Sequence, residues 1–410
     1  MEFKEYQLKD LLDIQWGDTT TTKSSYIDQG YLAYSASGPD GFLDHFDYDV
    51  DGVVLSAIGA NCGTTYMAKG KWSCIKNTIR FLPKNNHIDI KYFYYLSKRS
   101  NFFPLRGSAQ PFISQTDIRD LYVDIPEVKY QRFIGKILDE IEQKITVNNQ
   151  ISQTLESIAQ SIFKSWFIDF DPVHAKSRGE KPFGMDDETA SLFPDSFEES
   201  ELGMIPEGWN VEPASSLFDF SIGRTPPRKE SSCFCAPGLG HTWISIKDLG
   251  TYGVFTKSSA ENLTADAVER YRVPIVPTGT VLMSFKLTLG RIAITCEPLA
   301  TNEAIAHFIP KKEDTLSSEY TYLFLKNFDF GNLDNTSSIA NATNSSQVRN
   351  ILFLRPNDLI LSAFQKLVSP LFKQIEILTR QNGSLEKFSD SLLPRLISGE
   401  LQIPEEILVS

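Results

Sequence analysis

The chain has 410 residues, of which 41% are hydrophobic and 22% charged, so it is long enough for two or three domains with separate cores. This composition excludes a disordered or fibrous protein. No apolar run reaches the roughly 18 residues that a membrane helix needs, and the first residues lack the pattern of a secretory signal, so we expect a cytoplasmic protein with no membrane partner. Five cysteines, an odd number spread over the chain, argue against a disulfide framework.

The net charge of −12 argues, taken alone, against a nucleic-acid partner, but the charge is unevenly distributed. Residues 69–106 carry nine basic residues and one acidic residue, which gives +8. Residues 180–207 carry nine acidic residues and one basic residue, which gives −8. The basic block favours contact with phosphates, whereas the alternative is that both stretches are ordinary solvated faces.

In chain order, two blocks of similar pattern emerge. Each consists of two expected strands and a third segment that leads into a helical pattern: 52–56, 80–83 and 121–126 in the first block, and 279–284, 307–310 and 351–356 in the second. The position numbers of Val53 and Val281 differ by 228 (281 − 53), and those of Pro126 and Pro356 differ by 230 (356 − 126). We therefore predict an α+β protein with two domains of similar topology, residues 1–126 and 209–356.

Two long helices are predicted at 127–170 and 357–401, because a heptad pattern is sustained there over four repeats. The first series of seam positions is Ile134, Ile141, Asn148, Leu155 and Ile162 in one helix, and Phe364, Leu371, Leu378, Leu385 and Leu392 in the other. The second series, three residues later, is Ile137, Lys144, Ile151 and Ile158, and Leu367, Gln374, Gln381 and Phe388. Polar residues in mid-seam fix the register of a coiled coil at some cost in stability. The alternative is two amphipathic helices packed in an ordinary core.

The remaining segments are expected to connect or end these elements. Residues 171–208 are predicted as an acidic linker, and residues 402–410 as a C-terminal tail. Ser369 and Pro370 resemble an N-cap followed by proline at the first helical position, which places the start of the second long helix there, after a short preceding turn.

No motif in the sequence indicates catalysis. Phosphate-binding loops, the nucleophile elbow, His-Glu-x-x-His and the Asn/Asp-Pro-Pro-Tyr/Phe motif of amino-methyltransferases are all missing. Two candidate metal groups are weak, because the cysteine spacing is not that of zinc sites and the second group lies in a Pro-containing linker: Cys233, Cys235 and His241, and Asp169, Asp171 and His174. We predict no catalytic residue and no metal site.

With no motif for catalysis or metal binding, the remaining candidates are residues that could bind a partner. The candidates are cations of the basic block, cations in the Gly- and Pro-rich segments of the second block, and two glutamines that precede the closing strands and carry amides able to read adenine edges. They are Lys69, Lys71, Lys76, Arg106, Gln115, Arg224, Arg228, Lys247, Lys286, Arg291 and Gln347. The alternative for each is a plain surface position.

Five strings carry a family resemblance. They are YQRFIGKIL from Tyr130, IAQSIFKSWFIDFDP from Ile158, LGMIPEGW from Leu202, WISIKD from Trp243 and SLLPRLISGEL from Ser391. Together, and over essentially the whole chain, they resemble the specificity (S) subunit of type I restriction-modification systems.

The resemblance implies two target-recognition domains, each reading one half of a split, asymmetric sequence in double-stranded DNA. It implies that the helices form an antiparallel coiled coil with pseudo-two-fold symmetry and dock two methyltransferase subunits, which carry S-adenosylmethionine. Motor-nuclease subunits that use ATP and magnesium join the assembly, and the S subunit itself is not catalytic and holds no cofactor. Two rival interpretations stay open: a coiled-coil scaffold with two protein-binding heads and no DNA binding, and a methyltransferase or nuclease whose active site the sequence does not reveal.

Overall fold

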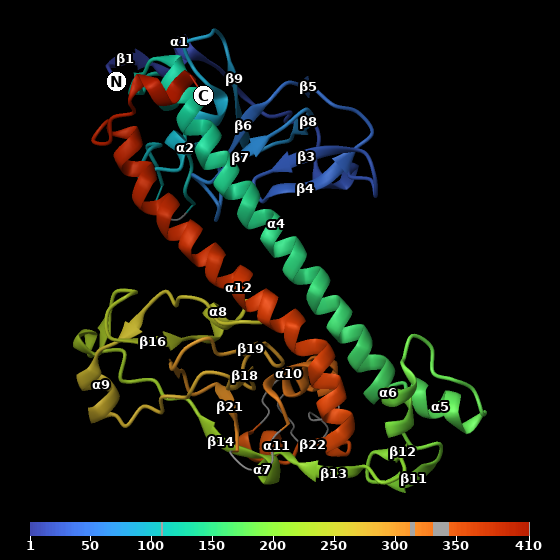
Figure 1. Cartoon of the computed structure of the whole chain (residues 1–410). Helices are drawn as coiled ribbons and strands as arrows, with labels where there is room; N and C mark the ends of the chain where they lie inside the picture. The colour runs from blue at the N-terminus through green and yellow to red at the C-terminus, as the bar shows by residue number, and fades with distance from the viewer. Residues whose placement is uncertain (108–109, 312–315, 331–343, 410) are drawn as a thin grey trace. The chain divides into compact units, whose positions relative to one another are not determined.

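The computed structural model describes residues 1–107, 110–311, 316–330 and 344–409. The chain forms two compact units, one of Met1–Thr146 with Leu385–Ser410 and the other of Val147–Ser384. Two helices of 40 residues, α4 (Val128–Phe167) and α12 (Asp358–Ile397), each contribute to both units (Figure 1). The predicted helices at 127–170 and 357–401 therefore exist, but the compact units divide the chain within these helices and not at their ends.

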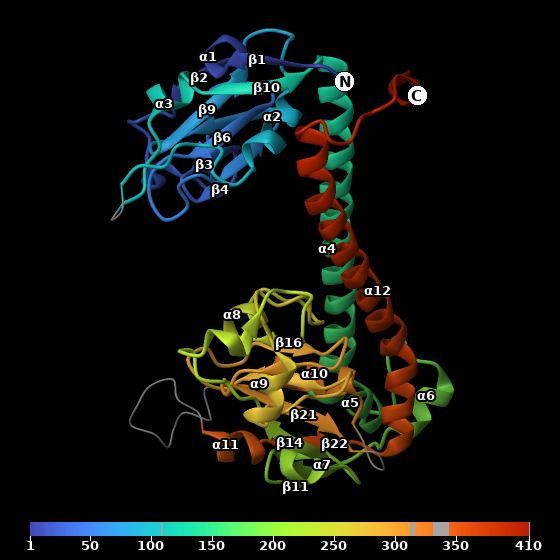
Figure 2. The ribbon, with the colours of Figure 1, turned by 90° about the vertical axis from the view of Figure 1, so that its left-hand side faces the viewer.

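The first unit is built on two four-stranded sheets. Strands in the order β2-β9-β6-β7 form one sheet, strands in the order β4-β3-β8-β5 form the other, and β1 pairs with β10. Helix α2 packs on β6 and β7 (Figure 2). The elements are β1 (Phe3–Gln7), α1 (Leu8–Leu11), β2 (Leu12–Trp16), β3 (Tyr31–Ser35), β4 (Gly38–Leu43), β5 (Tyr48–Asp49), β6 (Gly52–Ser56), β7 (Thr65–Ala68), β8 (Lys71–Cys74), β9 (Thr78–Pro83), α2 (Ile90–Ser97), α3 (Gln115–Arg119), β10 (Tyr122–Pro126) and, near the C-terminus, the 3-10 helix Glu405–Val409.

The second unit repeats the first of these sheets and part of the second. Its sheets have the orders β14-β21-β18-β19 and β15-β17-β16-β20, β13 pairs with β22, and α10 packs on β18 and β19. The elements are β13 (Asn210–Pro213), α7 (Ala214–Leu217), β14 (Phe218–Ile222), β15 (Phe234–Cys235), β16 (His241–Ile244), α8 (Ile246–Leu249), β17 (Asn262–Leu263), α9 (Ala265–Arg270), β18 (Val281–Ser284), β19 (Ile292–Ile294), β20 (Ala300–Thr301), β21 (Ile305–Pro310), α10 (Ser318–Asn327), α11 (Ser345–Arg349) and β22 (Leu352–Arg355).

The duplication extends to strand register. Val53 pairs with Phe81 in the first unit, and Val281 pairs with Phe308 at the same point of the second. Each second sheet also contains one parallel pair, β3 with β8 and β16 with β20, among antiparallel neighbours. The two blocks therefore share the order of the first sheet and the parallel pair of the second. The fourth strand of the second sheet differs, because β5 pairs with β8 in the first block and β15 pairs with β17 in the second.

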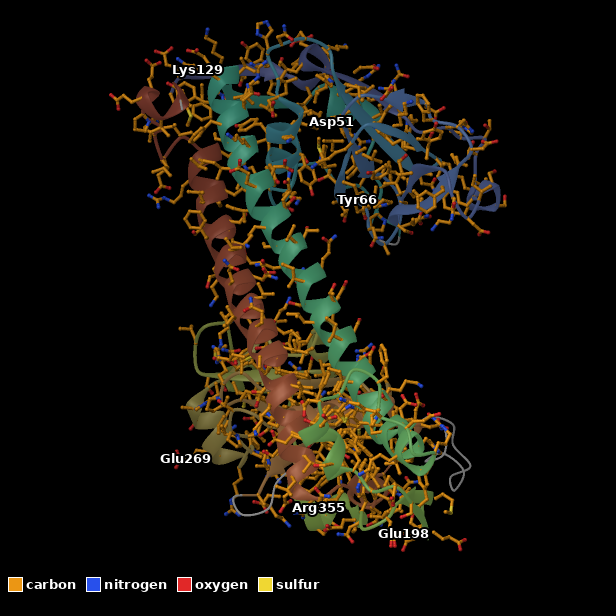
Figure 3. All side chains as sticks on the ribbon, turned by 45° about the vertical axis from the view of Figure 1, so that its right-hand side comes forward. Asp51, Tyr66, Lys129, Glu198, Glu269 and Arg355 are labelled. Atoms are coloured by element: carbon orange, nitrogen blue, oxygen red, sulfur yellow. The ribbon has the colours of Figure 1, made fainter. Side chains whose placement is uncertain are left out.

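The segment predicted as an acidic linker is folded. Residues 171–208 form α5 (Asp171–Ser177), α6 (Asp187–Leu192) and a hairpin of β11 (Phe197–Ser200) with β12 (Gly203–Pro206). Val173, Phe193 and Ile205 are buried in the core of the second unit, because apolar residues recur between the charges. The acidic side chains stay on the outside, as for Glu198 on the hairpin (Figure 3). The prediction of a linker is therefore wrong.

The two long helices pack side by side and antiparallel in the second unit. The ring of Phe364 in α12 lies 5.8 Å from that of Trp166 and 4.9 Å from that of Phe167, near the end of α4. Farther along α12, Asn382 contacts Asn148, nearer the start of α4. The first predicted seam series is buried or half-buried in both helices.

The second predicted seam series is exposed at most of its positions, although Ile137 is half-buried and Gln381 contacts Asn148. Ile151 and Ile158 of α4 and Leu367 and Phe388 of α12 are exposed. The helix period of 3.6 residues places the seam four positions after the first series, where both helices have buried or half-buried residues: Leu138, Ile145, Ser152 and Ala159, and Val368, Ile375, Asn382 and Ser389.

The predicted helix start at Ser369 and Pro370 is also wrong, because α12 begins at Asp358 and continues through both residues. Pro370 leaves one carbonyl of the preceding turn without its helical donor. The buried residues Phe364, Val368 and Phe372 stabilise the helix on both sides of this position by packing in the core.

A layer of amides interrupts the seam. The Nδ2 of Asn148 donates to Gln381 Oε1 at 3.0 Å and to Asn382 Oδ1 at 2.8 Å, and Asn382 Nδ2 donates to Asn149 Oδ1 at 2.9 Å. Asn148 is fully buried and Asn382 is 2% exposed. Among the described residues, Asn148 Oδ1 has no hydrogen-bond partner. The three hydrogen bonds that do form favour one register of the helices, since a shifted register breaks them.

We predict that Asn382→Ala lowers the free energy of unfolding by about 1–3 kcal/mol, because it leaves the buried Asn148 amide without a main partner. Urea unfolding followed by tryptophan fluorescence measures the change. Ser384→Ala, at an exposed position two residues away, is the control and should leave the unfolding midpoint unchanged. Equal effects of the two variants would contradict a role for the amide layer.

His307 is buried in β21 and links three strands. Its ring lies 2.7 Å from Ser221 Oγ in β14 and 2.7 Å from Thr301 Oγ1 in β20. Burial lowers the pKa of His307 to about 3, so the ring is neutral in the folded protein near pH 7. The unfolded chain binds a proton there below its ordinary pKa of about 6.5, whereas the folded protein does not.

We predict that the second unit loses about 2 kcal/mol of stability between pH 7.5 and pH 5 through His307 alone, because the unfolded state takes up the proton over that range. His307→Gln should remove most of this pH dependence in urea unfolding. The exposed His87 provides the control variant His87→Gln. An unchanged pH dependence in His307→Gln would show that this histidine is not the titrating group.

Candidate nucleic-acid interface

The basic block of the first unit is not one positive face. Lys69 and Lys91 both pair with Asp139, and Lys98 pairs with Glu142. Arg80 is buried and pairs with Asp13 at 2.8 Å. Lys69, predicted to contact DNA, is therefore directed to α4, because a half-buried carboxylate lies within its reach.

Lys71 and Lys76 remain available at the surface of the first unit. Lys71 begins β8, and its Nζ lies 4.6 Å from the ring centroid of Phe46 and 5.9 Å from that of Tyr31. Lys76 is exposed in the turn between β8 and β9, beside Asn77 with a positive φ of 68°. Tyr31 and Phe46 are exposed and stack edge to face at 4.9 Å. The sequence analysis missed these two rings, because it does not distinguish surface from core aromatics.

Arg106 and Gln115 have partners within the first unit. Arg106 pairs with Asp117 at 2.7 Å. Gln115 Nε2 donates to the carbonyl oxygen of Ile14 at 2.6 Å, and Arg119 Nη2 donates to the same oxygen at 3.3 Å. The amide of Gln115 thus ties α3 to β2, a structural role that the sequence did not indicate.

In the second unit, two predicted arginines gather around Trp243. The guanidinium of Arg228 lies 4.8 Å from the Trp243 ring and 4.4 Å from that of Phe234, and it pairs with Glu261. Arg224 Nη1 donates to the carbonyl oxygen of Tyr271 at 2.7 Å. Cations stacked on rings in this way are pre-oriented, so they lose little freedom when they bind an anion.

The other predicted residues of the second unit lie on α8, on a loop and on α11. Lys247 is exposed on α8, and Arg291 Nη1 donates at 2.7 Å to the carbonyl oxygen of Ile246, the residue before Lys247. Lys286 is exposed, next to Leu287 with a positive φ of 63°. The side-chain Oε1 of Gln347 accepts from the Asn344 backbone nitrogen at 2.9 Å in a capping box, so that atom has a structural role.

The described parts of the chain offer no metal centre. No group of three His, Cys, Asp or Glu residues among them is arranged to hold an ion. Cys235 Sγ donates to the carbonyl oxygen of Leu239 at 3.2 Å, and the ring of His174 stacks on Phe197 at 4.7 Å. Within the same residues, no helix is long and apolar enough to cross a bilayer.

The sequence matches a known family over most of its length. The model of the family described as "Type I restriction modification DNA specificity domain" matches residues 1–157 and 206–380, one match in each repeat. This chain belongs to the type I restriction-modification DNA specificity family. The resemblance identified from the five strings is thereby confirmed.

Relatives in this family align over nearly the whole chain. The type I restriction enzyme HindI specificity subunit of Haemophilus influenzae is 28% identical over 92% of this chain and 87% of its own length. The type I restriction enzyme MjaIX specificity subunit of Methanocaldococcus jannaschii is 23% identical over 86% and 78%. These relatives are named as specificity subunits, in agreement with the prediction that the chain is a non-catalytic subunit of this kind.

A solved structure shares the fold. The S subunit of a type I restriction-modification system from M. genitalium superposes with a TM-score of 0.60 at 15% identity, covering 97% of this chain and 96% of the other. At this identity the likeness concerns the fold alone. It agrees with the mixed α and β architecture predicted for a specificity subunit.

Proposed function

We propose that this chain selects the DNA sequence on which a type I restriction-modification complex acts. Each β-rich block is a recognition head for one half of a bipartite, asymmetric site. The observation that carries this proposal is the repetition of one strand order in the first sheet of each unit, with the same register between its central strands, in units whose surface loops differ. A shared frame with unlike loops suits two related but unequal half-sites.

The exposed cations supply the phosphate contacts in this proposal. Lys71 and Lys76 serve the first head, and Lys247 and Lys286 serve the second. Arg224 and Arg291 donate to backbone carbonyl oxygens of the second head, and the guanidinium of Arg228 lies on aromatic rings. In this proposal the three residues hold the loops that read the bases. Arg106, Gln115 and Gln347 have intramolecular partners and reach DNA only through groups that those contacts leave unused. Phosphate contacts position a protein on the duplex, whereas base edges carry the sequence information.

The long helices act as the spacer. We propose that α4 and α12 form an antiparallel coiled coil along their length, that the heads are related by a pseudo-two-fold axis, and that the helices dock two methyltransferase subunits. At about 1.5 Å per residue, each helix of 40 residues spans about 60 Å. The antiparallel contacts in the second unit and the amide layer support this view, since a fixed register gives a fixed gap between half-sites.

The chemistry of methylation and cleavage belongs to the partners in this proposal. The methyltransferase subunits hold S-adenosylmethionine, and motor-nuclease subunits use ATP and magnesium, while this chain binds none of these groups and works in the cytoplasm. A net charge of −12 suits a subunit that relies on its partners for part of the phosphate neutralisation.

We predict that Lys71→Ala and Lys286→Ala each reduce the slope of log affinity against log salt by about 0.9, the contribution of one phosphate contact. Fluorescence anisotropy of the complex with its methyltransferase subunits, measured on duplex DNA between about 50 and 200 mM salt, gives this slope. Lys387→Ala, at an exposed position of α12, is the control. A scaffold with protein-binding heads would give the wild-type slope in both variants, because its partners alone would then contact the DNA.

We predict that exchanging residues 1–126 for the corresponding segment of a relative changes one half of the methylated sequence and leaves the other half and the gap unaltered. Mapping of methylated adenines in a host that carries the chimaera and its partner subunits reads both halves at once. The reciprocal exchange of residues 209–356 should alter the opposite half. Changes in both halves from a single exchange would contradict a separate role for each head.

A further inference from the structure

One face of α4 contacts helix α2 of the first unit and the residues just before it. The residues on this face recur at helical spacing: Gln131, Gly135, Asp139 and Glu142. The side chain of Gln131 is fully buried, accepts from the Asp89 backbone at 2.9 Å and donates to the carbonyl oxygen of His87 at 2.9 Å, just before α2 begins. α4 thus engages the chain that leads into α2 from its first turns.

The two helices lie close together at Gly135. A Cβ atom at this position would lie 3.0 Å from the backbone nitrogen of Tyr92 and 3.1 Å from Lys91 Cβ. These atoms belong to the backbone and stem of α2, so a larger residue would require the helices to move apart by a few tenths of an ångström. The contact therefore favours a glycine here.

Ion pairs complete the same face. Asp139 Oδ1 accepts from Lys69 Nζ at 3.1 Å, Asp139 Oδ2 accepts from Lys91 Nζ at 2.7 Å, and Glu142 Oε1 accepts from Lys98 Nζ at 2.5 Å. The side chain of Asp139 is 12% exposed. Burial acts to raise the pKa of Asp139, but hydrogen bonds from Lys91 and Lys69 outweigh it and hold the pKa below its ordinary value.

The second unit uses different chemistry at the matching position. Glu142 and Phe372 are separated by the same offset as Pro126 and Pro356, so the carboxylate of one helix corresponds to a phenyl ring of the other. The ring of Phe372 lies edge to face with that of Tyr322 of α10 at 5.8 Å and with that of Phe255 at 6.3 Å. Tyr322 also donates to Glu156 of α4 at 2.7 Å, and Lys326 lies 4.0 Å from the same carboxylate. Both units bury apolar residues of the long helices, and at this position the first unit adds ion pairs where the second adds aromatic rings.

We propose that Asp139 and Glu142 are positioning residues that orient the first recognition head on α4. This inference rests on the proposed function. The carboxylates pair with Lys91 in α2, with Lys98 just after α2, and with Lys69 just after β7. Helix α2 packs on the sheet of the head. The ion pairs therefore join the head to the spacer helix at three points. Their loss leaves the head folded but less firmly oriented, and the complex then accepts altered gaps between half-sites.

The test uses the complex with its methyltransferase subunits and duplexes in which the mapped gap is kept, shortened by one base pair or lengthened by one. We expect Asp139→Asn/Glu142→Gln to reduce the preference for the native gap by about fivefold while the bases preferred in each half-site stay the same. Lys91→Ala breaks the contact from the other side and should act in the same direction. Glu140→Gln, at an exposed position of the same helix, is the matched control.

Hydrogen exchange of residues 90–97 in the full chain provides a second readout, because a loosened α2 exchanges faster in the double variant than in Glu140→Gln. Faster exchange with an unchanged gap preference would overturn the positioning role and leave a contact that is structural only. Unchanged exchange would overturn the attachment itself. A wild-type complex that methylates no bipartite site would instead refute the proposed function, and the positioning role with it.

Discussion

Two buried amides, Asn148 and Asn382, favour one register of the long helices. An apolar seam tolerates a shift by one heptad, because leucine packs on leucine in either register. Asn148 and Asn382 do not, since a shift places a buried amide against hydrocarbon, where it loses hydrogen bonds worth about 1–3 kcal/mol. A seam of apolar residues alone would be more stable, whereas the amide layer defines one register. For a protein proposed to measure a gap in DNA, a defined register is the more useful property.

The repeated frame explains how two heads can differ in what they bind while sharing a fold. The paired strands β6 and β9, and β18 and β21, keep the same register, so their buried residues are under the same packing constraints. The loops carry no such constraint. The second head has α8 and α9 between β16 and β18, where the first head has no α-helix between β3 and β6. Differences of this kind alter the binding surface without altering the core.

The sequence predicted the duplication and the long helices well because both leave periodic signals. The sequence offsets between the two blocks are nearly equal because the buried strands occur in the same order. The first seam series was predictable because one position of each heptad is buried or half-buried. The second series was wrong because Ile151 and Ile158 are apolar yet exposed, and a pattern of residue types does not report which neighbouring face is buried. The prediction of a linker at residues 171–208 was wrong because the charged residues dominate the composition, while the apolar residues Phe193 and Ile205 between them are buried.

The candidate interface was predicted less well, because charge alone does not say where a side chain is directed. Lys69 and Lys91 belong to a segment of net charge +8, but their partner Asp139 lies far along the chain in α4, so only the fold brings the charges together. Gln115 was selected for an amide that could read a base, and that amide donates to the backbone of β2.

The attachments of α2 and α10 differ in how far they depend on solution conditions. The ion pair with Glu142 is partly exposed and weakens as salt rises, whereas the pairs of the buried Asp139 are screened less and the buried ring contacts do not depend on charge. The charged face of α4 therefore gives the first head a more salt-dependent contact than α10 has, where Lys326 lies 4.0 Å from Glu156. An apolar contact at Glu142, as at Phe372, would have been the simpler way to fix the head. A charged contact keeps α2 attached through lysines that lie in the same basic segment as Lys71 and Lys76. Attachment to the helix and the proposed contact with phosphate thus draw on neighbouring cations. Under that proposal, bound DNA would change the electrostatic environment of the ion pairs that hold the head.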